Sequence, residues 1–138
     1  MATQLEDIYD VFYSLVKIDL TKYPELDVNV ESNIVEAYLK SALYEYEENL
    51  GQTLTIDGES IVEEIPVHHN RILGRLIYKN YRERELSESL QIANHFNKRS
   101  ELEVTGIQSK IVALREMLTN IQSELNRSFT RNIMKGIN

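Results

Sequence analysis

Apolar residues near the start of the chain recur at the three- and four-residue spacing of one helix face, which predicts a helix over residues 3–16. Thr3 and Glu6 have the spacing of a capping box, in which a hydroxyl and a carboxylate satisfy the free N–H groups of a helix start. Pro24 and the turn-forming residues around it predict a break after this helix. The apolar face consists of Leu5, Ile8, Tyr9, Phe12, Leu15 and Val16.

A second apolar stripe predicts a helix over residues 31–50. Gly51 follows it, and a glycine in that position readily adopts the left-handed conformation that ends a helix. Tyr44, Glu47 and Glu48 lie off the stripe, and both glutamates fall in the last turn, where the helix dipole disfavours anions. We therefore expect this acidic face to meet a basic neighbour.

The stretch TLTIDGESIV has a different pattern and predicts a short β-hairpin. Its strands would be residues 53–56 and 59–62, joined by Asp57 and Gly58, the dipeptide that a two-residue type I′ turn favours. A lone hairpin is marginally stable in water. It must therefore pack on the helices or add to the strands of a neighbour.

A third helix is expected from Pro66 to about residue 85, and a short further helix over residues 86–93, offset at Ser87. Gly74 inside the third helix costs about 1 kcal/mol relative to alanine, unless another element packs closely there. The stretch HFNKRSELEVTG that follows is predicted to be irregular.

The last helix, residues 106–128, carries an apolar seam at alternating four- and three-residue spacing. The seam consists of Ile107, Ile111, Leu114, Leu118, Ile121 and Leu125. It suits the central helix of a bundle better than an intermolecular coiled coil, because the shorter helices of the chain need a surface to pack against. Residues 129–138 show no period and are interpreted as a tail that is flexible or ordered by a partner.

These elements predict a mainly α protein: a small helical bundle with a long C-terminal helix and a short β-hairpin insertion. Residues 1–128 would form a single helical domain, which suits a chain of 138 residues with 42% hydrophobic side chains. The start of the chain lacks the basic and apolar segments of a secretory signal, and no membrane helix is expected.

The net charge of −7 divides unevenly along the chain. Residues 1–68 contain 15 acids and three lysines, whereas residues 69–138 contain 12 Lys and Arg and seven acids. Two interpretations remain open. The halves are differently solvated faces of a monomer, or the acidic side of one chain meets the basic side of another.

The stretch RILGRLIYKNYRER interleaves basic and aromatic residues, as in some nucleic-acid-binding segments. Four of its basic residues share one side of the predicted helix: Arg71, Arg75, Lys79 and Arg82. A solvated face and a salt-bridged subunit contact both explain this row. The sequence pI of about 5.0 argues against a nucleic-acid-binding domain.

No catalytic or cofactor motif is found, so an enzyme is not expected and no cofactor is implied. His68 and His69 are neighbours that would point apart on a helix, and no cysteine is present to complete a metal site. The chain lacks a G-x-S-x-G nucleophile turn and both of the common glycine-rich phosphate loops. The carboxylates of the first half resemble a solvated face more than an acid–base pair.

The order of elements resembles that of the small head–tail connector (neck adaptor) proteins of tailed phages that infect Gram-positive bacteria. The resemblance rests on the acidic first helix, on VEAYLKSALYEYEENL with its YLKSA element, on the mid-chain helix NRILGRLIYKNYREREL, and on the long terminal helix GIQSKIVALREMLTNIQSELNRSFTRN. It covers most of the chain as a pattern. The TLTIDGESIV hairpin departs from it.

The resemblance implies a virion protein that is assembled in the host cytoplasm and forms a ring of roughly twelve copies beneath the portal protein. Such a ring extends the DNA channel without sequence-specific binding and presents a platform to a tail or stopper protein. An acidic channel would let DNA slide, because attraction to the phosphates would hold it. The tail residues implied in portal docking are Phe129, Arg131, Ile133 and Met134. The alternative is a monomeric or dimeric cytosolic helical adaptor or regulator that binds a partner protein.

Overall fold

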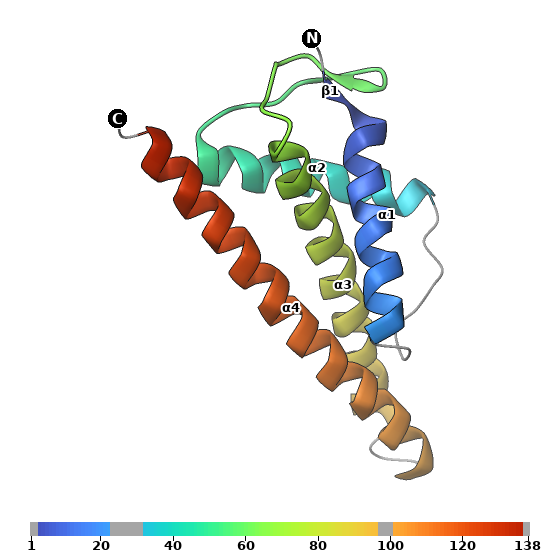
Figure 1. Ribbon diagram of the computed structural model, residues 1–138. Helices are drawn as coiled ribbons and strands as arrows, with labels where there is room; N and C mark the ends of the chain where they lie inside the picture. Colours follow the sequence, from blue (N-terminus) through green and yellow to red (C-terminus); the bar gives the residue numbers. More distant parts are fainter. Residues whose placement is uncertain (1–2, 23–31, 97–100, 137–138) are drawn as a thin grey trace.

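Four helices and a small antiparallel sheet make up the described part of the chain (Figure 1). This computed structural model describes the backbone of residues 3–22, 32–96 and 101–136, and the side chains of residues 3–19, 21–22, 35–93 and 108–132. The elements are β1 (Thr3–Gln4), α1 (Leu5–Lys22), α2 (Ser32–Leu50), β2 (Ile56–Asp57), β3 (Ser60–Ile61), α3 (His69–Phe96) and α4 (Glu101–Gly136). The predicted mainly α class, with its long last helix and hairpin, is confirmed.

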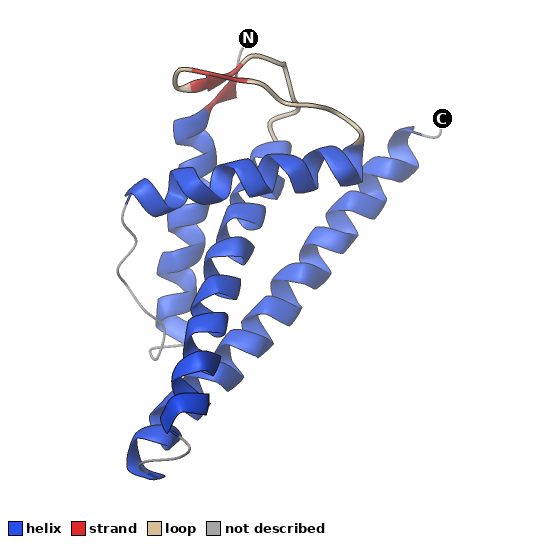
Figure 2. Cartoon of the chain, turned by 180° about the vertical axis from the view of Figure 1, so that it is seen from behind, coloured by secondary structure: helices blue, strands red, loops and turns tan. Residues whose placement is uncertain are grey.

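Helix α3 is the centre of the arrangement. Helices α1, α2 and α4 each pack against it, whereas α2 and α4 contact each other only slightly. Helix α4 runs diagonally along one side of α3, and α2 crosses the opposite face of the molecule, where it lies in front of α1 and α3 in Figure 2. The side chains that these helices bury against one another form one core. Its fully buried members include Ile8, Phe12, Ala42, Tyr46, Leu73, Leu76, Ile77, Tyr78, Leu114 and Leu125.

Helices α1 and α3 approach each other closely at Gly74. A Cβ atom placed on Gly74 would lie 2.6 Å from both Cβ and Cγ1 of Val11 and 3.1 Å from the backbone oxygen of Ile8. Ordinary carbon–carbon contacts are about 3.5–4.0 Å. Gly74 therefore allows α1 to pack closely against α3. This is the condition under which a glycine was expected inside the third helix.

The N-terminal residues form a strand instead of the predicted capping box. Thr3 pairs with Ile61 and Gln4 with Ser60, so β1 is antiparallel to β3. The helix begins only at Leu5, and it continues to Lys22, six residues beyond the predicted end. The capping-box prediction is wrong because the backbone of Thr3 is engaged by a strand from the middle of the chain.

The predicted hairpin is present, but its turn is shifted by one residue. Ile56 pairs with Ile61 and Asp57 with Ser60, so the two turn residues are Gly58 and Glu59. Gly58 has φ of +62°, and no non-glycine residue in the described ranges has a positive φ. A type I′ turn needs positive φ at both central residues, whereas glycine at the first position alone is the pattern of type II′.

Helix α2 and its end agree with prediction. The helix covers Ser32–Leu50, and Gly51 follows it with φ of +71°. The N–H of Gly51 donates to the backbone oxygen of Glu47 over 2.8 Å. This bond satisfies one of the carbonyl groups that a helix end leaves free.

Helix α3 continues through the offset predicted at Ser87, and no separate helix covers residues 86–93. The prediction failed because Glu85 and Ser89, which interrupt the apolar pattern, are buried. Helix α4 begins at Glu101, before the predicted residue 106, so the irregular segment is shorter than expected. Its residues 97–100 lie outside the described ranges.

Helix α4 also continues beyond its predicted end at Ser128, to Gly136. Phe129 is only 6% exposed and belongs to the core, four residues after the buried Leu125. The predicted end of the last helix is therefore corrected: the seam extends past residue 128. The seam packs against α3 of the same chain. Ile111, Leu114, Ile121 and Leu125 are buried and Leu118 is partly buried, and Ile107 lies outside the described side chains.

Candidate functional site: a basic pocket between helices α3 and α4

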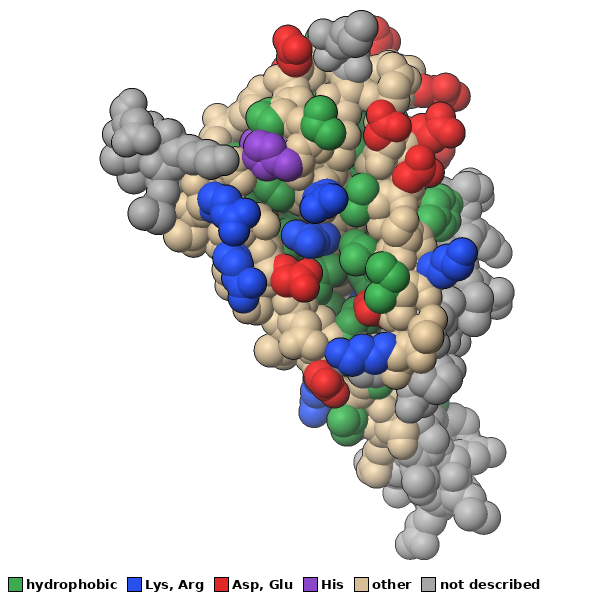
Figure 3. Space-filling model, in the orientation of Figure 1, with side chains coloured by type: hydrophobic (Ala, Val, Ile, Leu, Met, Phe, Trp, Pro, Cys, Tyr) green, Lys and Arg blue, Asp and Glu red, His purple; other side chains and the backbone are tan. Residues whose placement is uncertain are grey.

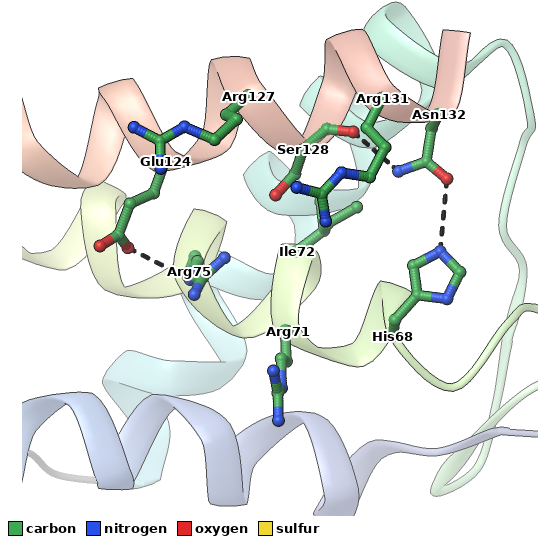
Figure 4. Close-up of a pocket in the computed structure, with 9 residues that line it drawn as sticks. All are labelled: His68, Arg71, Ile72, Arg75, Glu124, Arg127, Ser128, Arg131 and Asn132. Carbon is green, nitrogen blue, oxygen red and sulfur yellow. Dashed lines mark hydrogen bonds and ion pairs between the residues drawn. The ribbon is translucent and has the colours of Figure 1, made fainter. Parts of the chain in front are cut away.

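A pocket of about 300 Å³ opens between the start of α3 and the C-terminal part of α4 (Figure 4). Its lining combines four arginines with a single carboxylate: His68, Arg71, Ile72, Arg75, Glu124, Arg127, Ser128, Arg131 and Asn132. The same face of the molecule shows Lys and Arg side chains gathered beside histidine in Figure 3, whereas acidic side chains gather at the upper right of that view.

Helical spacing places these arginines in two pairs, one on each helix. Arg71 and Arg75 lie one turn apart on α3, and Arg127 and Arg131 lie one turn apart on α4. In Figure 4 Arg131 reaches from α4 into the space between the helices, whereas Arg71 extends from α3 away from α4 and lies at the rim. The pocket thus depends on the two helices packing side by side, and neither supplies it alone.

The pocket carries an excess of positive charge. The only ion pair among its lining residues joins Arg75 Nε to a carboxylate oxygen of Glu124, at a distance of 3.5 Å. Within the part of the chain that the structure describes, Arg71, Arg127 and Arg131 make no ion pair. Four arginines against one glutamate leave three positive charges uncompensated, with the histidine neutral, on a chain whose net charge is −7.

One end of the pocket is held by a chain of hydrogen bonds that starts at Asn132. The amide of Asn132 donates to the backbone oxygen of Ser128 over 2.8 Å, and its oxygen lies 2.9 Å from Nε2 of His69 and 3.4 Å from Nε2 of His68. Because the amide oxygen only accepts, His69 carries its proton on Nε2. Its Nδ1 then accepts the hydroxyl of Tyr46, at 2.6 Å.

Burial perturbs the ionisation of both buried partners in this chain. It lowers the pKa of His69 below its usual 6.5, and the neighbouring His68 adds to the effect, while the bond to Asn132 opposes it. Burial raises the pKa of Tyr46 to about 12. The neutral His69 thus connects the pocket wall to the core of α2. The rings of His68 and His69 meet edge to face, with their centres 4.6 Å apart. The expectation that they point apart is wrong because His68 precedes the first turn of α3.

The chemistry of this arrangement is anion recognition. Guanidinium groups bind carboxylates and phosphates through paired N–H donors, and a concave site excludes part of the competing water. Among the described residues, no group of three or more His, Asp or Glu side chains gathers as metal ligands would.

Two of the four basic residues predicted to share a side of the third helix, Arg71 and Arg75, line the pocket. Lys79 does not. Its ammonium group donates to a Glu45 carboxylate oxygen at 2.6 Å and to Gln122 at 3.3 Å. Lys79 thus joins α3 to α2 and α4 inside one chain, where it is 9% exposed.

Arg82 has no exposed surface, which corrects its assignment to an interface. Its Nε donates to the hydroxyl of Tyr78 at 3.0 Å, and its guanidinium forms an ion pair with Glu85. The guanidinium carbon lies 5.1 Å from the ring centre of Tyr78 and 4.9 Å from that of Tyr81. Arg82 is part of the core because a carboxylate and two aromatic rings compensate its charge.

The predicted acidic face lies at the C-terminal end of α2. Tyr44 is 68% exposed, and Glu47 and Glu48 are exposed as well. One carboxylate oxygen of Glu47 accepts the hydroxyl of Thr53 at 2.8 Å. None of these three α2 residues lines the basic pocket.

The predicted docking tail divides between core and pocket. Phe129 is buried and Arg131 lines the pocket, whereas the side chains of Ile133 and Met134 lie outside the described ones. Sequence reasoning missed Asn132 because it ended the helix at residue 128, and it assigned no role to Arg127 within that helix. The one-turn spacing of Arg127 and Arg131 was the available signal.

No protein-family model matches the chain, and no match appears among curated proteins or solved structures. In the described ranges, none of the helices combines the length and the apolar character needed to cross a bilayer.

Proposed function

We propose that the protein is a structural adaptor of a virion, a head–tail connector that forms a ring beneath the portal and joins the head to the tail. The observation that carries this proposal is the pocket of uncompensated arginines on a chain that is acidic overall. Such a pocket is a receptor for negative charge, and copies of the chain itself present a large supply of exposed carboxylates.

The placement of the charges suits contacts between copies. In a head-to-tail contact, one surface of each subunit meets a different surface of the next, and a rotation that closes gives a ring. In Figure 3, basic side chains and acidic side chains gather in separate areas of one face. A positive surface and a negative surface that face each other also set the register of the contact and repel wrong orientations.

The identity of the ring as a connector comes from the order of elements along the sequence. The portal would lie on one side of the ring and a tail or stopper protein on the other, with DNA passing through the channel. The competing function is an adaptor that binds an acidic partner protein as a monomer or dimer. Both functions use the pocket, but only the connector requires many copies of the chain in one closed assembly.

Native mass spectrometry of the full chain, alone and with the portal protein, tests the proposal. We expect a single ring stoichiometry, and dissociation at high salt because screening weakens the charged contact. The double variant Arg71→Glu and Arg131→Glu should remain monomeric. Arg115→Glu makes one such substitution at an exposed position of α4 outside the pocket lining, and it should assemble normally. A chain that stays monomeric with and without portal overturns the proposal.

A further inference from the structure

The tip of the β2–β3 hairpin presents two carboxylates on a narrow turn. Asp57 and Glu59 flank Gly58, and all three residues are exposed. Within the described part of the chain, neither carboxylate forms an ion pair or a hydrogen bond. The hairpin lies at the end of the molecule beside the start of α1, and the pocket lies between α3 and α4 (Figures 1 and 4).

The hairpin is held firmly although its strands are only two residues long. Strand β1 pairs with β3 as a third strand, and the N–H of Leu5 donates to the backbone oxygen of Glu59 at 2.9 Å. On the other arm, the N–H of Thr55 donates to the Glu63 carboxylate at 2.6 Å, and this bond lowers the pKa of Glu63. The tip is therefore presented in one orientation before any partner binds, which reduces the entropy lost on binding.

We propose that the hairpin tip of one copy binds in the basic pocket of the next, with the carboxylates of Asp57 and Glu59 paired with Arg71, Arg127 and Arg131. This inference rests on the proposed function and names the partner of the same pocket. A two-residue turn projects narrowly from the molecule. The pocket is concave, with a volume of about 300 Å³, and so offers a shape that a narrow turn can enter. Two carboxylates also reduce the excess of three positive charges in the pocket to one.

The acidic end of α2 is the competing occupant, and the structure favours the hairpin over it. Glu47 already accepts a hydrogen bond from Thr53, and Glu45 is paired with Lys79 within the chain. Glu48 is exposed, but it lies on the last turn of a helix, which is wider than a two-residue turn. The carboxylates of the hairpin tip have no such partner among the described residues, and they lie on a narrow turn.

Charge reversal separates these occupants when assembly is measured by native mass spectrometry and by sedimentation over a concentration series. Asp57→Lys with Glu59→Lys should weaken assembly at least about tenfold, since close charge pairs at interfaces contribute 1.4 kcal/mol or more. The matched control, Glu47→Lys with Glu48→Lys, makes the same charge change and should assemble like the unaltered chain. Far-ultraviolet circular dichroism should show equal helix content in all variants.

The decisive experiment asks whether two charge-reversed variants restore assembly when they are mixed. The lysine variant of the hairpin, mixed with Arg71→Glu and Arg131→Glu chains, should form complexes that neither variant forms alone. Loss of assembly in the α2 control with normal assembly of the hairpin variant overturns the inference and leaves the ring proposal standing. Equal assembly of both variants overturns the inference as well. A monomeric unaltered chain overturns the ring proposal itself.

Disulfide trapping gives an independent readout because the chain contains no cysteine. Ile56→Cys places a thiol beside the tip, and Ser128→Cys places one in the pocket wall, and neither alters a charge. Mild oxidation of a mixture of the two variants should yield crosslinked dimers. Tyr44→Cys mixed with Ser128→Cys should yield none, and a crosslink in that control alone contradicts the proposed occupant.

Discussion

Replacement of Gly74 by alanine tests whether the approach of α1 and α3 is as close as the structure shows. The new Cβ would lie 2.6 Å from Cβ and Cγ1 of Val11, about 1 Å inside ordinary contact, and 3.1 Å from the backbone oxygen of Ile8. The Cβ of Val11 is attached directly to the backbone of α1, so a side-chain rotation cannot move it. The two helices must separate, and the fully buried Ile8 and Phe12 must move with α1.

Two opposing effects set the size of the change in stability. Alanine is a better helix former than glycine by about 1 kcal/mol, which favours the substitution. Added atoms in a packed interior cost about 1–3 kcal/mol, and a clash with an immovable atom belongs in the upper part of that range. We therefore expect Gly74→Ala to lower the free energy of unfolding by about 1–2 kcal/mol.

Urea unfolding followed by far-ultraviolet circular dichroism, at one protein concentration, measures this loss. The background Val11→Gly removes the two atoms at 2.6 Å and leaves only the milder contact with the Ile8 oxygen at 3.1 Å. In that background Gly74→Ala should be neutral or should stabilise by up to about 1 kcal/mol, as helix propensity predicts. Equal effects in the two backgrounds, or a stabilised single variant, would refute the close approach.

Three further predictions concern the end of α4, the buried histidine and the internal ion pair. Phe129→Ala should lower the free energy of unfolding by about 3–5 kcal/mol, whereas Thr130→Ala, at an exposed neighbouring position, should have little effect in the same urea titration. His69 binds its proton less readily folded than unfolded, so stability should decline as pH falls below about 6.5, and His69→Gln should lose this part of the pH dependence. Glu45→Gln should cost about 1–3 kcal/mol because Lys79 is left charged and largely buried, and the deficit should persist in high salt.

Elements determined by neighbouring residues were predicted well from the sequence. The apolar stripe of α2 and the glycine that ends it are local signals, and so are the seam of α4 and the hairpin. The pairing of Thr3 with Ile61 is not local, since the two residues meet only once the helices between them have packed. The hydroxyl of Thr3 and the carboxylate of Glu6 have capping-box spacing, but the backbone bonds of a strand took precedence.

The sequence pointed to the α3 residues of the basic pocket but not to most of its α4 residues. The arginine row of α3 was recognised, but a spacing rule cannot tell an exposed cation from one that a buried carboxylate and aromatic rings surround, as for Arg82. The half supplied by α4 was missed because polar residues after Leu125 hid the continuing apolar position at Phe129. One further turn of helix would have placed Arg131 beside the start of α3, next to Asn132.

The central position of α3 has a consequence for native-state hydrogen exchange. Helices α1, α2 and α4 are joined to one another chiefly through α3, so any of them can open while the other two remain packed. The amides of α3 around Leu76 and Ile77 should then exchange only through global unfolding, because all three neighbours must leave before they are exposed. The amides of α4 should exchange by a lower-energy opening that disrupts the pocket, and an anion bound there should slow it.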